Sequence, residues 1–518
     1  MSGNSIRIHR LSIDWWQELV DLGIIEAQEN RWLQTMSELT NGDQLEKINL
    51  PDSFTTQLRP YQEQGAAWLN FLRTHSLGGV LADDMGLGKT VQLLAGLEQA
   101  RTEDPEQKFL VIAPTSVVGN WVNEATRFTP QMRVQSITST AKKTGLSILE
   151  QIGDAQLVVT SYAIFRLSFE EFEEAGFSVL ILDEAQQLKN HTSKGYKQAR
   201  QLSVPCKLVV TGTPMENNLM ELWALVSLAA PGLLGGQKAF KDNYQKQIAD
   251  GDSERLQRLK KRLRPFVLRR TKEQVVPELP AKTEQVLEVE LEPGHRKAYD
   301  RRFQRVRQEI LGLVDDVDSN RFKILQSLTL LRQLALDPSL VDEGNAPSAK
   351  LEMLRELMAD AVAEGHKILV FSQFTSFLGK ARDIAAELGI DHGYLDGATS
   401  APKRKEMIDG FSDGQFPVFF ISLKSGGFGI NLTTADYCIL LDPWWNPAAE
   451  AQAIDRAHRI GQTKPVYVYR LVAKNTIESK VLALQAKKTQ LFNDVLGEQT
   501  DTAQSSVLSA DDFLALMQ

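Results

Sequence analysis

The segment GGVLADDMGLGKTVQLL contains the residue types that bind a phosphate chain. Gly86 and Gly88 let backbone N–H groups approach phosphate oxygens, Lys89 can reach the β- and γ-phosphates, and the Thr90 hydroxyl can ligate Mg²⁺. The segment departs from the strict G-x-x-x-x-G-K-[ST] pattern, because Asp83 stands where the first glycine is expected. The chemistry that these residues predict is binding of a nucleoside triphosphate together with a divalent cation.

Two adjacent carboxylates, Asp183 and Glu184, end the apolar run in VLILDEAQQLK. A buried strand would deliver both to the carboxyl edge of a parallel sheet. Asp183 suits Mg²⁺ coordination, and Glu184 suits polarisation of an attacking water, which requires an ionised carboxylate within hydrogen-bond reach. The alternative is a pair that only caps the next helix. The upstream GKT segment favours the catalytic interpretation.

Two arginines, Arg456 and Arg459, lie in AAEAQAIDRAHRIGQ, a pattern that predicts a helix. Residues three apart share a helix face, so both guanidinium groups would point the same way. A guanidinium that meets a transferring γ-phosphoryl neutralises its developing charge and accelerates the reaction by ~10³–10⁵. Taken alone, the motif would favour a surface helix with salt-bridged arginines.

Two stretches of alternating strand and helix patterns must position these side chains. Short apolar runs bounded by turn residues, such as FLVIAP and FSVLILDEA in the first and KILVFSQF and PVFFISL in the second, are typical of strands buried in parallel sheets. We expect an α/β chain with two parallel-sheet lobes in tandem and helical insertions between them. The expected ranges are a leading helical segment 1–50, a first lobe 51–231, helical protrusions and linker 232–345, a second lobe 346–475, and a C-terminal helical brace and tail 476–518.

Composition limits the classes of partner. The 518 residues carry a formal net charge of −8, which argues against a protein that coats nucleic acid by bulk attraction. Basic runs at 255–272 and 295–308 leave room for local contact, although solvated helix faces are the alternative. The N-terminus has no apolar run typical of a signal peptide, and no stretch of 18 uncharged apolar residues follows. We therefore expect a cytoplasmic protein without a membrane partner.

The two cysteines, Cys206 and Cys438, are isolated from each other and from any histidine cluster. This spacing supports neither a disulfide framework nor a zinc site. Both cysteines are expected in the core.

These motifs, taken in order, resemble the Swi/Snf-type ATPases of helicase superfamily two over residues 58–490. LRPYQEQGAAWL at 58–69 resembles the adenine-sensing motif of that family, and DDMGLGKT resembles its form of the phosphate loop, which accounts for Asp83. PFVLRRTKEQVVPELPAK at 265–282 resembles the segment that follows the first helical protrusion. SLKSGG with DPWWNP is typical of bacterial members. The resemblance implies two RecA-like lobes with ATP bound between them.

The resemblance also implies a set of functional residues. The implied ATP contacts are Gln62, Asp84, Met85, Gly86, Leu87, Gly88, Lys89, Thr90, Gly429 and Asn431. Lys89, Glu184, Arg456 and Arg459 would be catalytic, and Thr90 with Asp183 would hold Mg²⁺. The implied DNA contacts, which grip phosphates and carry little sequence information, are Thr115, Asn120, Trp121, Ser161, Tyr162, Thr211, Gln373, Lys424, Ser425, Gly426 and Trp445.

We expect a motor that hydrolyses ATP to ADP and phosphate and moves along double-stranded DNA, with salt-sensitive and sequence-tolerant binding. A strand-separating helicase is one alternative. A nucleotide-responsive binding module without efficient turnover is another, although its signature, a lost Lys89, Glu184 or Arg459, is absent. An intrinsic nuclease lacks a paired-carboxylate or histidine–metal pattern outside the ATP site.

Targeting of the motor must come from the leading segment, from a region outside this chain or from protein partners, because no additional recognition module is evident. We expect the motor core of a larger bacterial protein or complex. Transcription recycling, repair and anti-phage defence all remain open as its cellular task.

Overall fold

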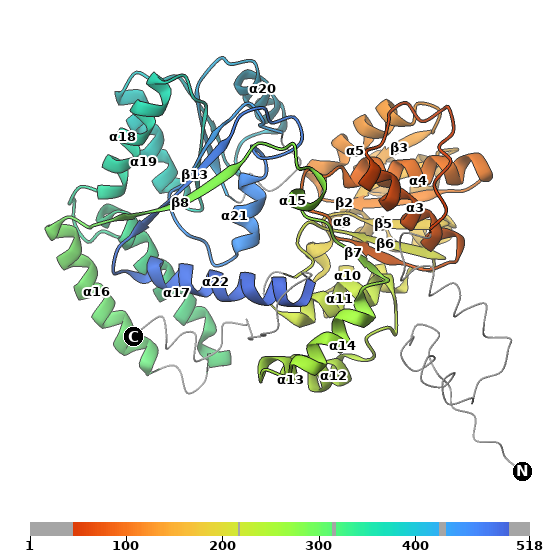
Figure 1. Ribbon diagram of the computed structural model, residues 1–518, viewed down its shortest axis with the longest axis horizontal. Coiled ribbons are helices and arrows are strands. Elements are labelled where there is room, and N and C mark those ends of the chain that lie inside the picture. Colours follow the sequence, from red (N-terminus) through yellow and green to blue (C-terminus); the bar gives the residue numbers. More distant parts are fainter. Residues whose placement is uncertain (1–44, 216–217, 313–316, 424–430, 497–518) are drawn as a thin grey trace, which may run out of the picture. The chain divides into compact units, whose positions relative to one another are not determined.

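The computed structural model describes residues 45–215, 218–312, 317–423 and 431–496. The described residues up to Pro277 form one compact unit, and those from Glu278 to Gln490 form a second (Figure 1). Each unit is built around one parallel sheet with helices, which confirms the expected α/β fold of two parallel-sheet lobes. Within the described ranges, no helix combines the length and apolarity needed to cross a membrane.

The first sheet has seven strands in the order β3-β4-β2-β5-β6-β1-β7, all parallel. Every residue of its central strands is buried, as expected where helices cover both faces of a parallel sheet. The carboxyl ends of these strands define the edge where ligands usually bind. The strands are β1 (Gly79–Leu81), β2 (Phe109–Ala113), β3 (Val134–Ile137), β4 (Leu157–Ser161), β5 (Val179–Leu182), β6 (Cys206–Val210) and β7 (Val267–Leu268).

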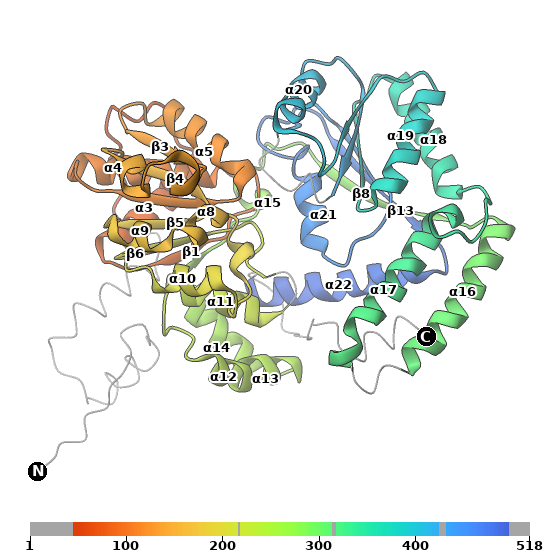
Figure 2. The same ribbon diagram turned by 180° about the vertical axis from the view of Figure 1, so that it is seen from behind.

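The helices of the first unit connect these strands, and α12 to α14 gather beside α11, apart from the sheet (Figures 1 and 2). They are α3 (Pro60–Thr74), α4 (Lys89–Glu103), α5 (Thr115–Phe128), α6 (Ala141–Thr144), α7 (Ile148–Ile152), α8 (Tyr162–Leu167), α9 (Phe169–Glu174), η3 (Ala185–Leu188), α10 (Lys194–Gln201), α11 (Leu219–Ala229), α12 (Gln237–Phe240), η4 (Lys241–Gln245), α13 (Lys246–Ala249), α14 (Ser253–Leu263) and α15 (Lys272–Val275).

The second sheet has six strands in the order β10-β11-β9-β12-β13-β8, again all parallel. Its central strands β9 and β11 are buried along their full length. The strands are β8 (Lys282–Val289), β9 (Ile368–Ser372), β10 (His392–Leu395), β11 (Val418–Ser422), β12 (Tyr437–Leu440) and β13 (Val466–Ala473).

The helices of the second unit include a pair, α16 and α17, whose members lie side by side in both views (Figures 1 and 2). They pack on each other through buried apolar residues such as Val306, Ile310 and Leu328. The helices are α16 (Pro293–Leu311), α17 (Val317–Leu336), η6 (Pro338–Val341), α18 (Ala349–Ala363), α19 (Thr375–Glu387), α20 (Ala401–Ser412), α21 (Pro447–Ile454) and α22 (Ile477–Leu496).

Two edge strands, β7 and β8, fall inside the range 232–345 that the sequence predicts as helical. β7 has only two residues within an arginine-rich run, and most residues of β8 are exposed, so neither shows the apolar pattern of a buried strand. β7 extends the first sheet and β8 extends the second, and the two compact units divide between them, after Pro277.

Both cysteines are free and buried, as expected. Cys206 begins β6 and Cys438 lies within β12. Burial raises the pKa of each thiol to about 12, so both behave as core residues.

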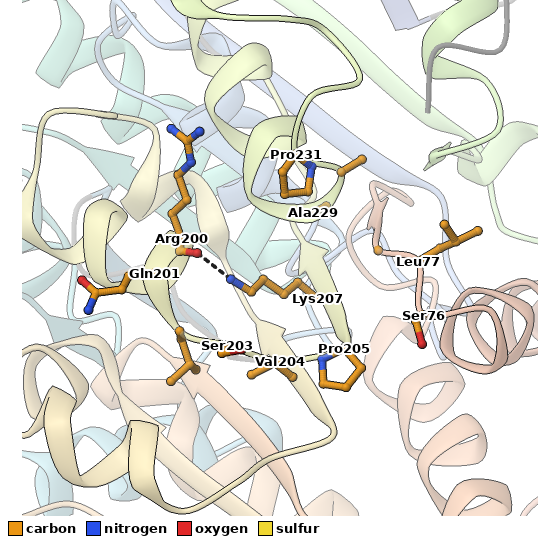
Figure 3. A pocket seen from close by; sticks show the side chains of 13 residues that line it. Ser76, Leu77, Arg200, Gln201, Ser203, Val204, Pro205, Lys207, Ala229 and Pro231 are labelled. Carbon is orange, nitrogen blue, oxygen red and sulfur yellow. Dashed lines mark hydrogen bonds between the residues drawn. The ribbon is translucent and has the colours of Figure 1, made fainter. Parts of the chain in front are cut away.

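A pocket of about 420 Å³ opens at the amino ends of β1 and β6 (Figure 3). Lys207 lies in its wall and donates hydrogen bonds to the carbonyls of Ala199 and Arg200, at 2.9 and 2.8 Å, where α10 ends. Burial lowers the pKa of this lysine to about 8. Ligands of such sheets usually bind at the carboxyl ends of the strands. The pocket is at the amino ends, so it lies at the opposite edge of the sheet from the expected nucleotide site.

Candidate nucleotide site and DNA-contact residues

The phosphate-binding segment forms the turn between β1 and the first residue of α4, Lys89. Gly86 and Gly88 adopt φ angles of 86° and 74°, which L residues rarely reach. A Cβ atom on Gly88 would also lie 2.6 Å from the Gln62 amide nitrogen. The local geometry therefore requires both glycines and leaves backbone N–H groups at the amino end of a helix, where phosphate binds readily.

The Lys89 ammonium is held at this turn by neutral acceptors of its own loop. It donates to the carbonyl oxygens of Asp83 and Asp84 at 2.7 and 3.2 Å. Phosphate oxygens are stronger acceptors for an ammonium than neutral carbonyls are. The side chain is thus placed where a bound phosphate chain would compete for it.

The predicted adenine contact, Gln62, lies on α3 directly against the phosphate loop. Its amide nitrogen donates to the Leu87 carbonyl at 3.1 Å, and its amide oxygen accepts from the Arg59 backbone N–H at 2.9 Å. The Tyr61 hydroxyl donates to the same Leu87 carbonyl at 2.9 Å. The residues expected at the adenine end and at the phosphate end are therefore physically linked.

The carboxylate pair follows the carboxyl end of β5. Asp183 accepts hydrogen bonds from the Trp121 indole at 2.7 Å and from the Glu184 backbone N–H at 2.9 Å. Tyr162 donates its hydroxyl proton to the Asp183 carbonyl at 2.7 Å. Burial and the adjacent Glu184 charge raise the pKa of Asp183 to about 7, against the opposing effects of the Trp121 hydrogen bond and the Lys89 charge.

A cation suits this carboxylate. Desolvation and a neighbouring like charge disfavour its ionised form, and a positive ion reverses both effects. Mg²⁺ prefers hard oxygen ligands and one or two carboxylates. Asp183, with the Thr90 hydroxyl at the start of α4, therefore fits the predicted magnesium ligands in chemistry. Within the described ranges, no cluster of three or more histidine, cysteine, aspartate or glutamate side chains could hold a metal ion.

Glu184 belongs to a chain of hydrogen bonds that crosses to the next strand. Its φ angle is 47°, an unusual left-handed conformation for a non-glycine residue. Its carboxylate accepts from the Gln186 amide at 2.7 Å, and the Thr211 hydroxyl donates to the Gln186 amide oxygen at 2.9 Å. Thr211 directly follows β6. The chain fixes the proposed base relative to the strand beside the phosphate loop.

The departure at Asp83 has a structural reason that sequence reasoning missed. Asp83 is fully buried, and its carboxylate accepts hydrogen bonds from the Arg270 side chain at 3.0 and 2.5 Å. Arg270 follows β7, 187 residues along the chain. The resemblance of 265–282 to a family segment indicates that this region matters. No pattern near Asp83 in the sequence, however, predicts that Arg270 is its partner.

The sequence predicts a helix that includes Arg456 and Arg459, but in the structure both residues lie beyond the end of that helix. α21 ends at Ile454 and is capped by Asp455, so Arg456 and Arg459 follow in turns. Arg456 is buried, with 3% of its surface exposed, whereas Arg459 is half-buried. The prediction that the two arginines share a helix face is therefore wrong. Their role as arginine fingers stays a prediction.

The DNA contacts predicted in the first unit lie near carboxyl ends of its strands, with very different exposure. Thr115 is exposed at the start of α5, and Asn120 is half-buried, with its amide donating to Glu124 at 2.9 Å. Ser161, Thr211 and Trp121 are buried. The Trp121 side chain points to Asp183, so in this structure it supports that carboxylate.

In the second unit Gln373 and Trp445 are half-buried, and Asn431 is exposed. The Gln373 backbone N–H donates to Asp442 at 3.2 Å, and the Arg332 guanidinium lies 5.1 Å from the centre of the Trp445 ring. Both residues follow strand ends, β9 and β12. The remaining predicted contacts of this unit, Lys424, Ser425, Gly426 and Gly429, lie outside the described residues.

Two protein-family models match the sequence. Residues 61–340 match the SNF2-related domain, and residues 349–461 match the helicase conserved C-terminal domain. An ATP-dependent helicase of Mycoplasma pneumoniae is 37% identical over 473 residues, which cover 91% of this chain and 45% of that protein. The ATP-dependent DNA helicase DDM1 of Arabidopsis thaliana is 33% identical over 501 residues, covering 89% of this chain and 65% of that protein.

The SWI2/SNF2 ATPase core of Sulfolobus solfataricus, solved in complex with double-stranded DNA, is a similar structure. It is 33% identical, with a TM-score of 0.45, covering 87% of this chain and 95% of that one. The chain spans about half the length of several curated relatives. The matched domains indicate ATPase activity.

Proposed function

This chain belongs to the SNF2-related family, and from that premise we propose that it is a DNA-stimulated ATPase that moves along double-stranded DNA. The observation that carries the proposal is the arrangement at one edge of the first sheet. The phosphate loop follows β1, Thr211 follows β6 and the Asp183–Glu184 pair follows β5, and these three strands are neighbours.

Each of these residues has a proposed task in hydrolysis. Backbone N–H groups at Gly86 and Gly88, with the Lys89 ammonium, bind the phosphate chain. Glu184 orients the attacking water and accepts its proton, and the Gln186–Thr211 hydrogen bonds hold Glu184 in place. Mg²⁺, held by Thr90 and Asp183, would supply charge neutralisation at the phosphates.

The proposed DNA track uses residues at the strand ends of both units. Thr115 and Asn120 of the first unit and Gln373 and Trp445 of the second combine hydroxyl, amide and aromatic groups suited to phosphate and sugar contact. A relative of 33% identity carries the name DNA helicase, which supports DNA as the polymer. Contacts of this kind predict binding that weakens steeply with salt and depends little on base sequence.

Steady-state ATP hydrolysis measured with and without duplex DNA tests this proposal. We expect Mg²⁺-dependent hydrolysis that rises several-fold on addition of duplex DNA of any sequence, because DNA contact and the ATP site belong to one cycle. Hydrolysis that is unchanged by duplex DNA, at low and at physiological salt, would contradict the proposal.

Two displacement assays, run side by side, distinguish movement along an intact duplex from unwinding of its strands. A translocase removes a third strand from a triplex but leaves the two strands of a plain duplex paired. We expect ATP-dependent triplex displacement alone. Efficient displacement of one strand of a plain duplex would favour the strand-separating helicase instead.

We further propose that the chain works as the motor of a larger bacterial protein or complex in the cytoplasm. Transcription recycling, repair and anti-phage defence would each fit such a motor, and protein partners would direct it to one of them.

A further inference from the structure

Arg270 contacts residues next to both predicted parts of the ATP site, Asp83 before the phosphate loop and Tyr61 beside the predicted adenine contact, although the sequence places it far from each. Its Nε and Nη2 atoms donate to the two oxygens of the Asp83 carboxylate at 3.0 and 2.5 Å. Its backbone N–H also donates to Asp83, at 3.1 Å, and its backbone carbonyl accepts from the Asp84 N–H at 3.0 Å. The start of the phosphate loop is thus fixed by Arg270 through both side chain and backbone.

The same guanidinium reaches the helix of the predicted adenine contact. Its Nη1 atom donates to the Tyr61 carbonyl on α3, and the guanidinium carbon lies 5.2 Å from the centre of the Tyr61 ring. Tyr61 precedes Gln62 and shares with it the Leu87 carbonyl of the phosphate loop. One side chain therefore sets the position of α3 relative to the loop.

The space around this guanidinium is closely fitted. Gln92 on α4 accepts from Nη2 at 2.7 Å and donates to Asp83 at 3.2 Å. Gly65 on α3 faces the same point, since a Cβ atom there would lie 1.9 Å from the Gln92 amide oxygen and 2.7 Å from Arg270 Nη2. A planar fork of donors that binds a carboxylate at two points gives geometric specificity that a lysine cannot give.

We propose that Arg270 is a positioning residue for ATP binding: by clamping Asp83 to α3 it sets the phosphate loop and the adenine contact at the spacing of one nucleotide. The inference rests on the proposed function. An aspartate at the first loop position then serves as the anchor for this clamp, which a glycine there would not provide. Arg270 is not proposed to touch ATP.

The direct test compares Arg270→Gln with a control that has the same chemistry elsewhere. Arg101, at the far end of α4, pairs through two donors with the buried Glu98, at 2.9 and 2.7 Å. The exposed side-chain fractions match, at 14% and 0% for that pair and 11% and 0% for Arg270 with Asp83. Arg101 lies about 18 Å along the helix from Lys89. Arg101→Gln therefore removes an equivalent ion pair without reaching the loop.

The readouts are the Kd for ATP, measured by calorimetry with Mg²⁺ and without DNA, and the split between KM and kcat. We expect Arg270→Gln to raise Kd and KM by at least about tenfold with kcat within about threefold, because the groups that act on the γ-phosphate remain. Arg270→Lys, which keeps the charge but loses the fork, should fall between wild type and Arg270→Gln. Arg101→Gln should bind ATP like wild type.

A second variant tests whether Arg270 acts through Asp83. Asp83→Asn combined with Arg270→Gln leaves no unpaired buried charge, so this double variant should fold at least as well as Arg270→Gln. If the clamp is the mechanism, the double variant loses no more ATP affinity than the worse of the two single variants. Losses that add in the double variant would overturn the clamp.

The outcomes separate this inference from the proposed function. Wild-type protein that fails to bind ATP would remove the proposed function itself. Wild-type binding accompanied by unchanged affinity in Arg270→Gln, or by an equal loss in Arg101→Gln, would overturn the positioning role and leave the ATPase proposal standing.

Discussion

Two buried carboxylates, one in each unit, follow strand ends and pair with arginines from distant segments. Asp83 follows β1 in the first sheet and pairs with Arg270. Asp442 follows β12 in the second sheet and pairs with Arg332. Their exposed fractions are 0% and 1%. Each lies next to predicted ligand contacts. Asp83 directly precedes the phosphate loop, and Asp442 accepts from the Gln373 backbone N–H and precedes Trp445 in the sequence.

The two pairs differ in how tightly they are closed. Arg270 binds both oxygens of Asp83, whereas the nearest distance between Arg332 and Asp442 is 3.7 Å. Among the described residues, the Oδ2 atom of Asp442 has no hydrogen-bond partner. Arg332 instead donates to the Pro443 carbonyl and lies 5.4 and 5.1 Å from the ring centres of Phe374 and Trp445.

This difference indicates different tasks for similar residues. A closed bidentate pair holds a loop in one geometry, which suits the binding of a ligand of fixed shape such as ATP. The buried Arg332 guanidinium instead lies against a carbonyl and two aromatic rings, with its carboxylate at a longer distance. The second arrangement holds the segment from Pro443 to Trp445 against α17.

The largest expected effect on stability comes from removing each carboxylate in turn. Asp83→Asn leaves the Arg270 guanidinium without its counter-charge, and we expect a loss of about 3–5 kcal/mol in the free energy of unfolding. Asp442→Asn should cost less, because this pair makes no direct hydrogen bond at 3.7 Å and the arginine keeps the Pro443 carbonyl and the two aromatic rings as contacts. Denaturant unfolding of both variants measures the contrast. Equal losses would break the comparison.

A steric change beside the Asp83–Arg270 pair tests how closely that pair is packed, without changing any charge. Gly65→Ala places a Cβ atom against Gln92 and Arg270, and we expect it to destabilise the protein by about 1–3 kcal/mol. Gly96→Ala on α4 is the matched control, since the nearest neighbouring atom would lie 4.0 Å away. That variant should gain up to about 1 kcal/mol from helix propensity. A well-tolerated Gly65→Ala would argue against a closely fitted clamp.

The smallest expected effect is the pH dependence of stability that arises from Asp442 in its pair with Arg332. Burial raises the pKa of Asp442 above its ordinary value, against the opposing charge of Arg332. The folded state therefore binds this proton more readily, and the stability present below the unfolded pKa is lost as pH rises through the folded pKa. Relative to wild type, Asp442→Asn should therefore be least destabilising near pH 8, and its cost should grow toward pH ~4. Thermal unfolding across this range checks the sign, and a constant difference would contradict it.

The sequence predicts most strands of both sheets because they are short, continuous apolar runs. It does not predict β3, β7 or β8, whose edge positions allow polar or charged residues along the strand. It also extends the helix before Arg456 too far, because no glycine or proline interrupts the pattern between Pro447 and Gly461. Helix ends of that kind are decided by tertiary contacts such as the hydrogen bond between His458 and the Pro280 carbonyl.

The candidate site shows the same division. Local spacing identifies the phosphate loop and the carboxylate pair, since each forms one strand-to-helix turn. The supporting partners are invisible in the sequence because they are distant: Trp121 lies 62 residues before Asp183, and Arg270 lies 187 residues after Asp83. A tryptophan assigned to DNA from a motif can therefore serve a carboxylate in the structure.

The most direct test of the ATPase account is a Glu184→Gln variant assayed for both ATP binding and turnover. The substitution keeps the shape of the side chain and a partner for Gln186, but removes the base. We expect ATP affinity within about threefold of wild type and DNA-stimulated hydrolysis lower by about 10²–10⁴-fold. Hydrolysis at the wild-type rate with ATP binding intact would contradict the proposed mechanism.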